Sequence, residues 1–296
     1  MKTFLLVLLS VLGSFTTLQA QLRAEAIFFD GKNRFYYIYV PKIYSSEKAV
    51  PVVVYLHGVG YMGVEDVADL YEPNQFIPIA DTANFILLVP VAEAFEKTGM
   101  RAWNSGAGIG FLGQGFSMNG DIDDKGFIEA MLDKVEGTYS VDKKRIYLCG
   151  FSMGGFMTQR MAIERNSRFA AFASVSGTIG GLIGDRTIIR DIPIAHFHGT
   201  NDPTISYTNP KIGKGAEETV AFWVKQNKCK EKPIKHEVYN DFDRKLDTLV
   251  SVDHYVYSNG KTNVEFFKKN ESVHTWLSDD SKRIWLFMRK YRLEEE

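Results

Sequence analysis

Short runs of apolar residues alternate along this chain with segments in which apolar residues recur every three or four positions. Continuous apolar runs of roughly four to eight residues are typical of strands buried on both faces of a parallel sheet. The repeating segments are typical of helices that press one side against such a sheet. The alternation therefore predicts an α/β fold with a mainly parallel sheet covered by helices on both faces. The expected core strands are Val52 to Leu56, Phe85 to Val89, Ile146 to Cys149, Phe172 to Val175, Ile192 to Phe197 and Val264 to Phe267.

One hairpin is expected before the first core strand, and three of the expected helices have clear apolar faces. Ala26 to Phe29 and Phe35 to Val40 flank a polar turn, which predicts an antiparallel hairpin at the edge of the sheet. Apart from the expected strand Val264 to Phe267, residues 230–273 are polar and poorly patterned. The helical faces are Phe127, Met131, Leu132 and Val135, then Met153, Met157 and Met161, and finally Ile284 to Tyr291.

The first twenty residues follow a different pattern. Lys2 precedes the apolar run Phe4 to Leu12, and a more polar stretch then ends at Ala20. The run is too short to span a bilayer and is typical of a secretory signal peptide, although a buried helix would share its composition. We expect cleavage after Ala20, export to the periplasm or the medium, and one catalytic domain over residues 21–296, because no linker or repeat divides the rest.

Charge and composition exclude several classes of partner. The net charge is −1, so the chain has no basic field for nucleic acid or an anionic membrane. The two thiols are Cys149, expected as a small buried residue of a core strand, and Cys229; a disulfide between them is the alternative in an oxidising compartment. No His, Cys or carboxylate cluster has metal-ligand spacing, so no metal or other cofactor is expected. The oligomeric state is not predicted.

Ser152 lies where an expected strand turns directly into an expected helix. Gly150 and Gly154 flank it as GxSxG, the nucleophile elbow, in which a tight turn lifts the serine hydroxyl clear of the sheet. A glycine-rich turn with an incidental serine is the alternative. The strand before and the helix after favour the elbow.

Two further residues complete a catalytic set at the ends of later strands. Asp202 follows the strand Ile192 to Phe197, and His274 follows the strand Val264 to Phe267. The order serine, acid, histidine is the one found in α/β-hydrolases. A serine hydroxyl needs an imidazole to take its proton, and the imidazole needs a carboxylate to hold its tautomer. We therefore predict Ser152, Asp202 and His274 as a catalytic triad.

Other candidates for these roles have structural explanations. Asp279 and Asp280 compete with Asp202, but their position is typical of the N-terminal cap of the last helix. Asp202 itself is alternatively a turn residue before Pro203. The remaining histidines are expected to be structural: His57 bonded in its loop, His196 and His198 satisfied inside the sheet, and His236 and His254 in a polar region without a strand end.

The sequence also predicts where a negatively charged intermediate and the substrate would lie. The N–H of Met153, next to the nucleophile, and that of Val59, between Gly58 and Gly60, are the expected oxyanion donors. Residues 100–120 combine six glycines with Trp103, Phe111 and Phe116, a composition that suits an aromatic wall beside the site, or else an ordinary loop with one buried tryptophan. We assign substrate contacts to Trp103 and to Trp276.

Six ordered motifs carry a family resemblance that runs from about Pro51 to Trp276. They are LHGVG, the Trp103–Asn104 pair, DIDDKGFIEAML, VDKKRIYLCGFSMGG, HGTND and HTW. Together they resemble the polyhydroxybutyrate depolymerase and feruloyl esterase branch of the α/β-hydrolases, which includes the family 1 carbohydrate esterases. The resemblance implies an α/β-hydrolase fold, the same triad, secretion, and ester substrates that are often side groups of polymers or polyesters. It also implies that Asp121, Asp123 and Asp124 are caps at the start of a helix.

Some features of the family pattern are changed. Family members often have glycines just before the histidine and a proline after HTW, where this chain has Glu271 to Val273 and Leu277. Cys229 matches a cysteine that is commonly bridged to a later one, and the later part of this chain offers Ser258 and no cysteine. These changes affect the inferred substrate preference and leave the triad in place.

We therefore predict a secreted serine esterase that hydrolyses feruloyl or acetyl esters on plant polysaccharide through an acyl-enzyme. Three alternatives remain: a polyhydroxyalkanoate depolymerase, a serine peptidase of the prolyl-oligopeptidase type, and a non-catalytic binding module on the same scaffold. A module of the last kind would be expected to lack a triad residue, and this chain has all three.

Overall fold

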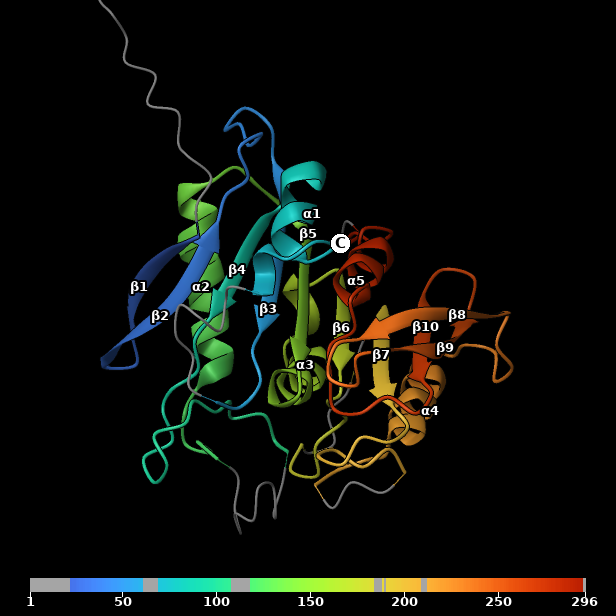
Figure 1. Cartoon of the computed structure of the whole chain (residues 1–296). Coiled ribbons are helices and arrows are strands. Elements are labelled where there is room, and N and C mark those ends of the chain that lie inside the picture. Colours follow the sequence, from blue (N-terminus) through green and yellow to red (C-terminus); the bar gives the residue numbers. More distant parts are fainter. Residues whose placement is uncertain are drawn as a thin grey trace, which may run out of the picture.

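The computed structural model describes residues 22–60, 69–107, 118–183, 188, 190–208 and 212–294. The expected signal peptide lies outside these ranges. The described strands form one ten-stranded sheet in the order β1-β2-β4-β3-β5-β6-β7-β10-β9-β8 (Figure 1). The strands are β1 (Arg23–Phe29), β2 (Lys32–Tyr39), β3 (Val50–Leu56), β4 (Ile86–Pro90), β5 (Val141–Phe151), β6 (Ala171–Val175), β7 (Ile194–Gly199), β8 (Lys235–Asp243), β9 (Thr248–Ser258) and β10 (Asn263–Lys269). The helices are α1 (Phe76–Ala83), α2 (Asp124–Thr138), α3 (Met153–Glu164), the 3₁₀ helix η3 (Asn166–Arg168), α4 (Ala216–Gln226) and α5 (Asp280–Met288).

The centre of the sheet is parallel and both of its ends are antiparallel. Strands β4, β3, β5, β6, β7 and β10 run parallel to one another. At one end β1 and β2 form the antiparallel hairpin that the sequence predicts, and at the other end β9 and β8 continue the sheet antiparallel to β10. The α/β prediction of a mainly parallel sheet with an N-terminal hairpin is confirmed.

Two separate cores cover the two faces of the sheet. Because side chains alternate along a strand, Leu148 of β5 packs with α2, α3 and α4, whereas Cys149 packs with α1 and α5 on the other face. Cys229 belongs to the first core, so the sheet separates it from Cys149, and both thiols are free and buried. The disulfide alternative is therefore not realised. Within the described part of the chain, no helix has the length and apolar content needed to cross a bilayer.

The region between residues 230 and 273 is more ordered than its polar sequence indicates. The strands β8 and β9 form a long hairpin there, with Lys235 paired to Val256 at one end and Asp243 to Thr248 at the other. Along β9 buried and half-buried residues alternate, and one buried position is His254, which bonds to Glu237 and Glu265, each at 2.9 Å. Our expectation of a poorly patterned region was wrong, because β8 buries Asp241 and Asp243 and exposes Val238 and Phe242, the reverse of the usual alternation.

Candidate active site

Ser152 occupies a strained turn between β5 and α3. Its backbone angles are φ 55° and ψ −118°, a conformation that residues other than glycine rarely adopt. The conformation is held on both sides, since its N–H donates to the carbonyl of Val175 at 2.9 Å and its carbonyl accepts from the N–H of Phe156 at 3.0 Å. Strain that the surroundings hold in place at a single residue is a feature of functional sites.

The two glycines of the motif are required by close packing. A Cβ on Gly150 would overlap the carbonyl of Gly154, and a Cβ on Gly154 would overlap the carbonyl of Leu56 on the neighbouring strand β3. The start of α3 therefore lies directly against the end of the sheet. This contact gives the predicted elbow its physical basis.

Asp202 and His274 form a hydrogen-bonded pair in which the carboxylate is buried and the imidazole is half-buried. The Nδ1 of His274 donates to Oδ2 of Asp202 at 2.7 Å, across 72 positions of sequence. The other carboxylate oxygen accepts from the N–H groups of Thr204 at 2.9 Å and Ile205 at 2.8 Å. Burial would raise the pKa of Asp202, but the bond and charge of His274 and the bond from Ile205 outweigh it, and the pKa lies below its usual range. Asp202 is therefore a carboxylate at neutral pH, and Nε2 of His274 is left for proton transfer.

The loops that carry this pair are bonded to each other. The strands β7 and β10 are parallel neighbours, so both loops leave the same edge of the sheet. The N–H of Asn201 donates to the carbonyl of Ser272 at 3.0 Å, and the N–H of Glu271 donates to Oγ1 of Thr200 at 2.8 Å. The carboxylate and the imidazole thus face each other from adjacent strands.

The nucleophile candidate follows a residue that contacts the histidine. Phe151, the residue immediately before Ser152, packs its ring against the His274 ring with centroids 4.9 Å apart. Strands β5, β7 and β10 therefore bring Ser152, Asp202 and His274 to one edge of the sheet. The sequence predicted that each residue follows a strand of the sheet, and their catalytic roles stay a prediction.

The β8–β9 hairpin supports the histidine loop, which the sequence did not predict. Lys245, in the hairpin turn, donates from Nζ to the carbonyl of His274 at 2.5 Å. Asp243 accepts a hydrogen bond at 2.7 Å from the hydroxyl of Ser272, two residues before the histidine. No motif in the chain marks these contacts, because they depend on how the hairpin folds back over the loop.

A buried ion pair fixes the other side of the histidine loop. The Nζ of Lys269 lies 2.6 Å from Oδ2 of Asp280, and both side chains are almost fully buried. Asp280 also accepts from the N–H of Leu277 at 2.8 Å, while Asp279 stands at the N-cap position of α5 without a side-chain bond to the helix. The expectation that these aspartates cap α5 is therefore wrong for the side chains. The carboxylate of Asp280 pairs with a lysine that the sequence left unassigned.

The expected oxyanion loop lies against Ser152. A Cβ on Gly58 would be 3.3 Å from the Cβ of Ser152, so the backbone of this loop lies close to the serine. Met153 is the first residue of α3, where an N–H has no partner inside the helix. No residue of the described ranges accepts a hydrogen bond from the N–H of Val59. The arrangement suits two backbone donors beside Ser152, the roles that we predict for Met153 and Val59.

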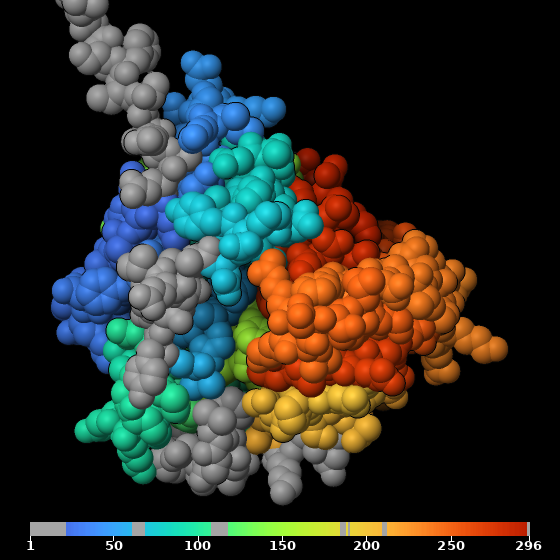
Figure 2. Space-filling view, in the orientation of Figure 1, coloured from blue at the N-terminus to red at the C-terminus, as the bar shows by residue number. Residues whose placement is uncertain are grey.

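An aromatic hollow of about 280 Å³ lies next to the histidine loop. Figure 2 shows this face, with the cyan residues around α1 opposite the orange β8–β9 hairpin. Trp276 lines the hollow, and its Nε1 donates to the hydroxyl of Ser281 at 3.1 Å, which in turn donates to Oε1 of Gln75 at 2.6 Å. The hollow is lined by Tyr55, Asp69, Leu70, Gln75, Phe76, Phe151, Arg244, Lys245, Thr275 and Trp276. The half-buried side chain of Trp276 thus forms part of the wall of this hollow.

Comparison with known proteins identifies the family to which this chain belongs. A model of the phospholipase/carboxylesterase family of α/β-hydrolases matches residues 41–252. The chain belongs to this family. Its fold agrees with that of solved α/β-hydrolase structures. An acetyl xylan esterase from Aspergillus awamori superimposes with a TM-score of 0.61 at 16% identity, over 90% of this chain and 99% of that one.

Two curated relatives of this carboxylesterase-family chain are larger proteins. A bifunctional acetylxylan esterase/xylanase of Neocallimastix patriciarum is 29% identical over 177 residues, which are 60% of this chain and 22% of that protein. Feruloyl esterase B of Piromyces equi is 26% identical over 223 residues, 68% of this chain and 39% of that protein. The chain spans less than two fifths of either relative's length. The resemblance to the feruloyl esterase branch is confirmed.

In this carboxylesterase-family chain Trp103 is buried and stabilises the neighbouring backbone. Its side chain is fully buried, and its Nε1 donates to the carbonyl of His57 at 2.9 Å. The prediction that Trp103 contacts substrate is therefore wrong, since a buried ring is closed to a ligand. Its bond instead fixes the backbone just before the expected oxyanion donor at Val59. Phe111 and Phe116 lie outside the described residues.

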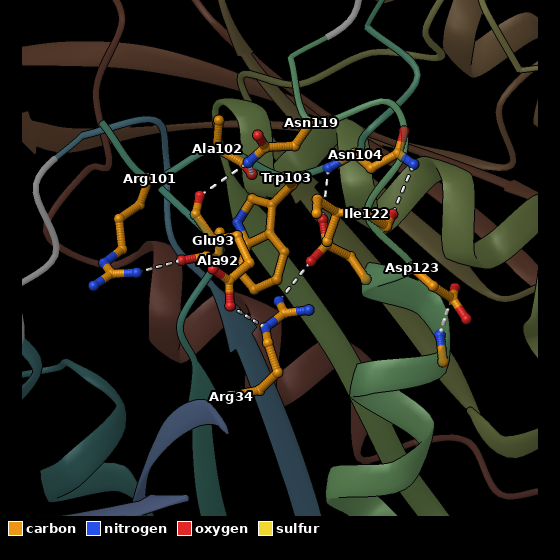
Figure 3. Close-up of polar contacts among 12 residues, drawn as sticks. Arg34, Ala92, Glu93, Arg101, Ala102, Trp103, Asn104, Asn119, Ile122 and Asp123 are labelled. Atoms are coloured by element: carbon orange, nitrogen blue, oxygen red, sulfur yellow. Dashed lines mark hydrogen bonds and ion pairs between the residues drawn. The ribbon is translucent and has the colours of Figure 1, made fainter. Parts of the chain in front are cut away.

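Figure 3 shows how the segment that contains Trp103 is held. Arg34 of β2 forms ion pairs with Glu93 at 3.0 Å and Asp124 at 2.6 Å. The same Asp124 accepts from the N–H of Asn104 at 2.7 Å, and Asn119 donates to the carbonyls of Glu93 and Ala102. The network holds the backbone on both sides of the tryptophan.

The three aspartates assigned to a helix start have separate outcomes. Asp123 is the N-cap of α2 and accepts from the N–H of Gly126 at 3.0 Å, as predicted. Asp124 is wrong as a cap, because its carboxylate bonds to Arg34 and Asn104 instead. Asp121 is exposed and makes no cap in the structure.

The remaining histidines are structural, with one unexpected feature. His57 bonds to the carbonyl of Gly58 at 2.5 Å and to the N–H of Ala92 at 3.1 Å, as expected for a loop residue. His236 lies on β8 and pairs with Asp253 at 2.6 Å. His196 was expected to be satisfied, but its Nδ1 has no partner among the described residues. Within those residues no group of three or more His, Cys, Asp or Glu side chains is arranged to hold a metal.

Proposed function

We propose that this chain is an exported serine esterase that hydrolyses carboxylic esters, with Ser152, His274 and Asp202 as its triad in a catalytic domain over residues 21–296. The observation that carries the proposal is the 2.7 Å bond between His274 and Asp202 at the sheet edge where Ser152 stands in a strained turn. Membership of the phospholipase/carboxylesterase family supports the same chemistry. The apolar segment at the N-terminus supports export.

The proposed reaction has two halves that share one oxyanion site. Ser152 Oγ attacks the ester carbonyl while Nε2 of His274 takes its proton, and the imidazolium is stabilised by Asp202. The N–H groups of Met153 and Val59 receive the negative oxygen, each contributing about 3 kcal/mol to the transition state. His274 then gives its proton to the leaving alcohol as the C–O bond breaks. A water molecule, deprotonated by the same histidine, cleaves the acyl-enzyme and releases the acid.

We propose acetyl or feruloyl esters carried on plant polysaccharide as the substrates. Support comes from the relatives, which are named as acetylxylan and feruloyl esterases. The hollow beside the histidine loop is walled by aromatic rings, among them Phe151 and Trp276, which suits a planar acyl group or a sugar ring. We assign substrate contact to Trp276 on this basis.

The decisive experiment compares Ser152→Ala with the wild type on p-nitrophenyl acetate, p-nitrophenyl butyrate and methyl ferulate. Ser140→Ala is a matched control, because Ser140 immediately precedes the other end of the same strand, β5. We expect Ser152→Ala to lose several orders of magnitude in rate and Ser140→Ala to keep it. Equal activity of wild type and Ser152→Ala would reject Ser152 as the nucleophile. Inactivity of the wild type on all three esters would reject the esterase proposal.

A further inference from the structure

Two buried histidines of β7 lie behind the proposed catalytic acid. His198 is fully buried, His196 is 2% exposed, and the two rings are in contact with centroids 5.3 Å apart. His198 precedes Asp202 by four residues, and its Nε2 is 3.6 Å from the same carboxylate oxygen that meets His274. The proposed mechanism gives neither histidine a role.

The contacts of His198 determine which of its nitrogens carries the proton. Its Nε2 lies 2.9 Å from the carbonyl oxygen of Ile205, and a carbonyl only accepts, so Nε2 is the donor. In a neutral ring Nδ1 is then an acceptor, and its neighbour at 3.3 Å is Nε2 of His196, which must donate. The hydrogen bonds therefore run in one direction, from His196 through His198 to Ile205. This direction makes the Nδ1 of His196 an acceptor. In agreement with it, that atom has no hydrogen-bond partner among the described residues.

The last bond of this series acts on the turn that holds the carboxylate. The N–H of Ile205 donates to Oδ1 of Asp202 at 2.8 Å, and the carbonyl of the same residue accepts from His198. His198 thus ties the turn of residues 202–205 back to the strand from which it leaves. With Oδ1 held by the turn, Oδ2 is directed at Nδ1 of His274.

The surroundings keep His198 uncharged at neutral pH. Burial is the main reason that the pKa of His198 is lowered to about 4, and His274 and Lys269 lower it further. The Ile205 carbonyl and the Asp202 carboxylate act in the opposite direction and only partly offset this effect. The other ring packed against it, Tyr207, lies edge-on with centroids 5.9 Å apart. A neutral His198 donates a hydrogen bond without competing with His274 as the cationic partner of Asp202.

We propose that His198 is a positioning residue, which fixes the 202–205 turn so that Oδ2 of Asp202 meets Nδ1 of His274. The inference rests on the proposed function for the importance of that contact. The contact itself is a property of the folded chain and can be measured without any substrate.

The test uses the low-field proton resonance of an imidazole N–H bonded to a carboxylate, read by NMR in the full chain. His274→Gln assigns the signal, and His198→Leu and His198→Gln are compared with it. We expect His198→Leu to shift or broaden the resonance and His198→Gln, whose amide N–H can still reach the Ile205 carbonyl, to retain most of it. His236→Gln, on the exposed face of β8, is the matched control and should leave it unchanged.

Kinetics provide a second readout. With p-nitrophenyl acetate, His198→Leu should lower kcat by up to about a hundredfold at similar KM, the scale expected for a misplaced catalytic group. The acid limb of its pH profile should move to lower pH, because a misplaced carboxylate stabilises the imidazolium less well. If His198→Leu lowered kcat only by loosening the fold, His198→Gln would not be expected to restore kcat.

The outcomes separate this inference from the proposed function. A folded His198→Leu with an unchanged resonance and pH profile would overturn the positioning role, as would the absence of the resonance in the wild type. If His198→Leu does not fold, His198→Gln and His196→Leu decide: a retained signal in the first and a weakened one in the second support the role, and the reverse rejects it. A wild type that shows the resonance but hydrolyses no ester would reject the esterase proposal alone.

Discussion

Lys245 donates a 2.5 Å hydrogen bond to the backbone carbonyl of His274, so a turn at the antiparallel end of the sheet holds the proposed catalytic base in place. We predict that Lys245→Met lowers kcat/KM on p-nitrophenyl acetate by about threefold to tenfold, since a small displacement of a catalytic group is costly. Stability should change by less than about 1 kcal/mol, because the side chain is exposed. Lys42→Met, also exposed but far from the site in sequence and contacts, should leave both quantities unchanged, and an equal loss in the two variants would contradict the prediction.

The buried pair of Lys269 and Asp280 predicts a large loss of stability when one partner is removed. Lys269→Met should lower the free energy of unfolding in urea by about 3 to 5 kcal/mol, because it leaves the Asp280 carboxylate buried without its cation. The double variant Lys269→Met with Asp280→Leu should be closer to wild type than the single variant. A double variant that is less stable than the single one would show that the pair is not the source of the effect.

Substitution by alanine should have opposite effects on stability at two glycines, Gly154 in the packed elbow and Gly137 in the exposed part of α2. Gly154→Ala places a methyl group on the carbonyl of Leu56 and should destabilise the fold by about 1 to 3 kcal/mol or more. Gly137→Ala, in an exposed turn of α2 with open space around the position, should stabilise it by about 0.5 to 1 kcal/mol. Thermal unfolding of both variants measures the contrast, and a Gly154→Ala protein as stable as the wild type would count against the close approach of α3 to β3.

Asp241 predicts a pH dependence of stability with an unusual sign. Burial raises its pKa to about 6, and the charge of Asp280 adds to the effect. A carboxyl group whose pKa is raised by folding binds more protons in the folded chain, so its contribution to stability falls as pH rises from about 4 to about 6. Asp241→Asn should therefore be more stable than wild type at pH 7, by on the order of 1 to 3 kcal/mol, with the difference vanishing below about pH 4. Urea unfolding at pH 4 and pH 7 tests this, and a difference that grows toward low pH would be the opposite result.

The sequence was informative where apolar residues or a strained motif dominate. The core strands, the elbow at Ser152 and the pairing partners Asp202 and His274 follow from runs of apolar residues that end in polar loops. Strand β5 was expected from Ile146 but begins at Val141, because its first residues are partly exposed and polar.

The features that the sequence did not reveal depend on contacts between distant polar residues. The β8–β9 hairpin was missed because the buried positions of β8 are Asp241 and Asp243, whereas its apolar residues Val238 and Phe242 are exposed. Trp103 was assigned to the substrate because its segment combines glycines with aromatic residues, whereas its ring is fully buried and bonds to the carbonyl of His57. Burial of a single ring is decided by packing between segments, which local composition does not encode.

The bond between Gln75 and Ser281 joins positions that are 206 residues apart and lies directly behind Trp276. Bringing two such distant segments together lowers the conformational entropy of the chain, and this loss precedes any favourable contact between them. The nucleophile turn between β5 and α3 depends on nearer segments, since Ser152 bonds to Val175 of β6 and Gly154 packs on Leu56 of β3. The side of the site that carries Trp276 is therefore complete only when the segment between β3 and β4 meets the final helix, α5.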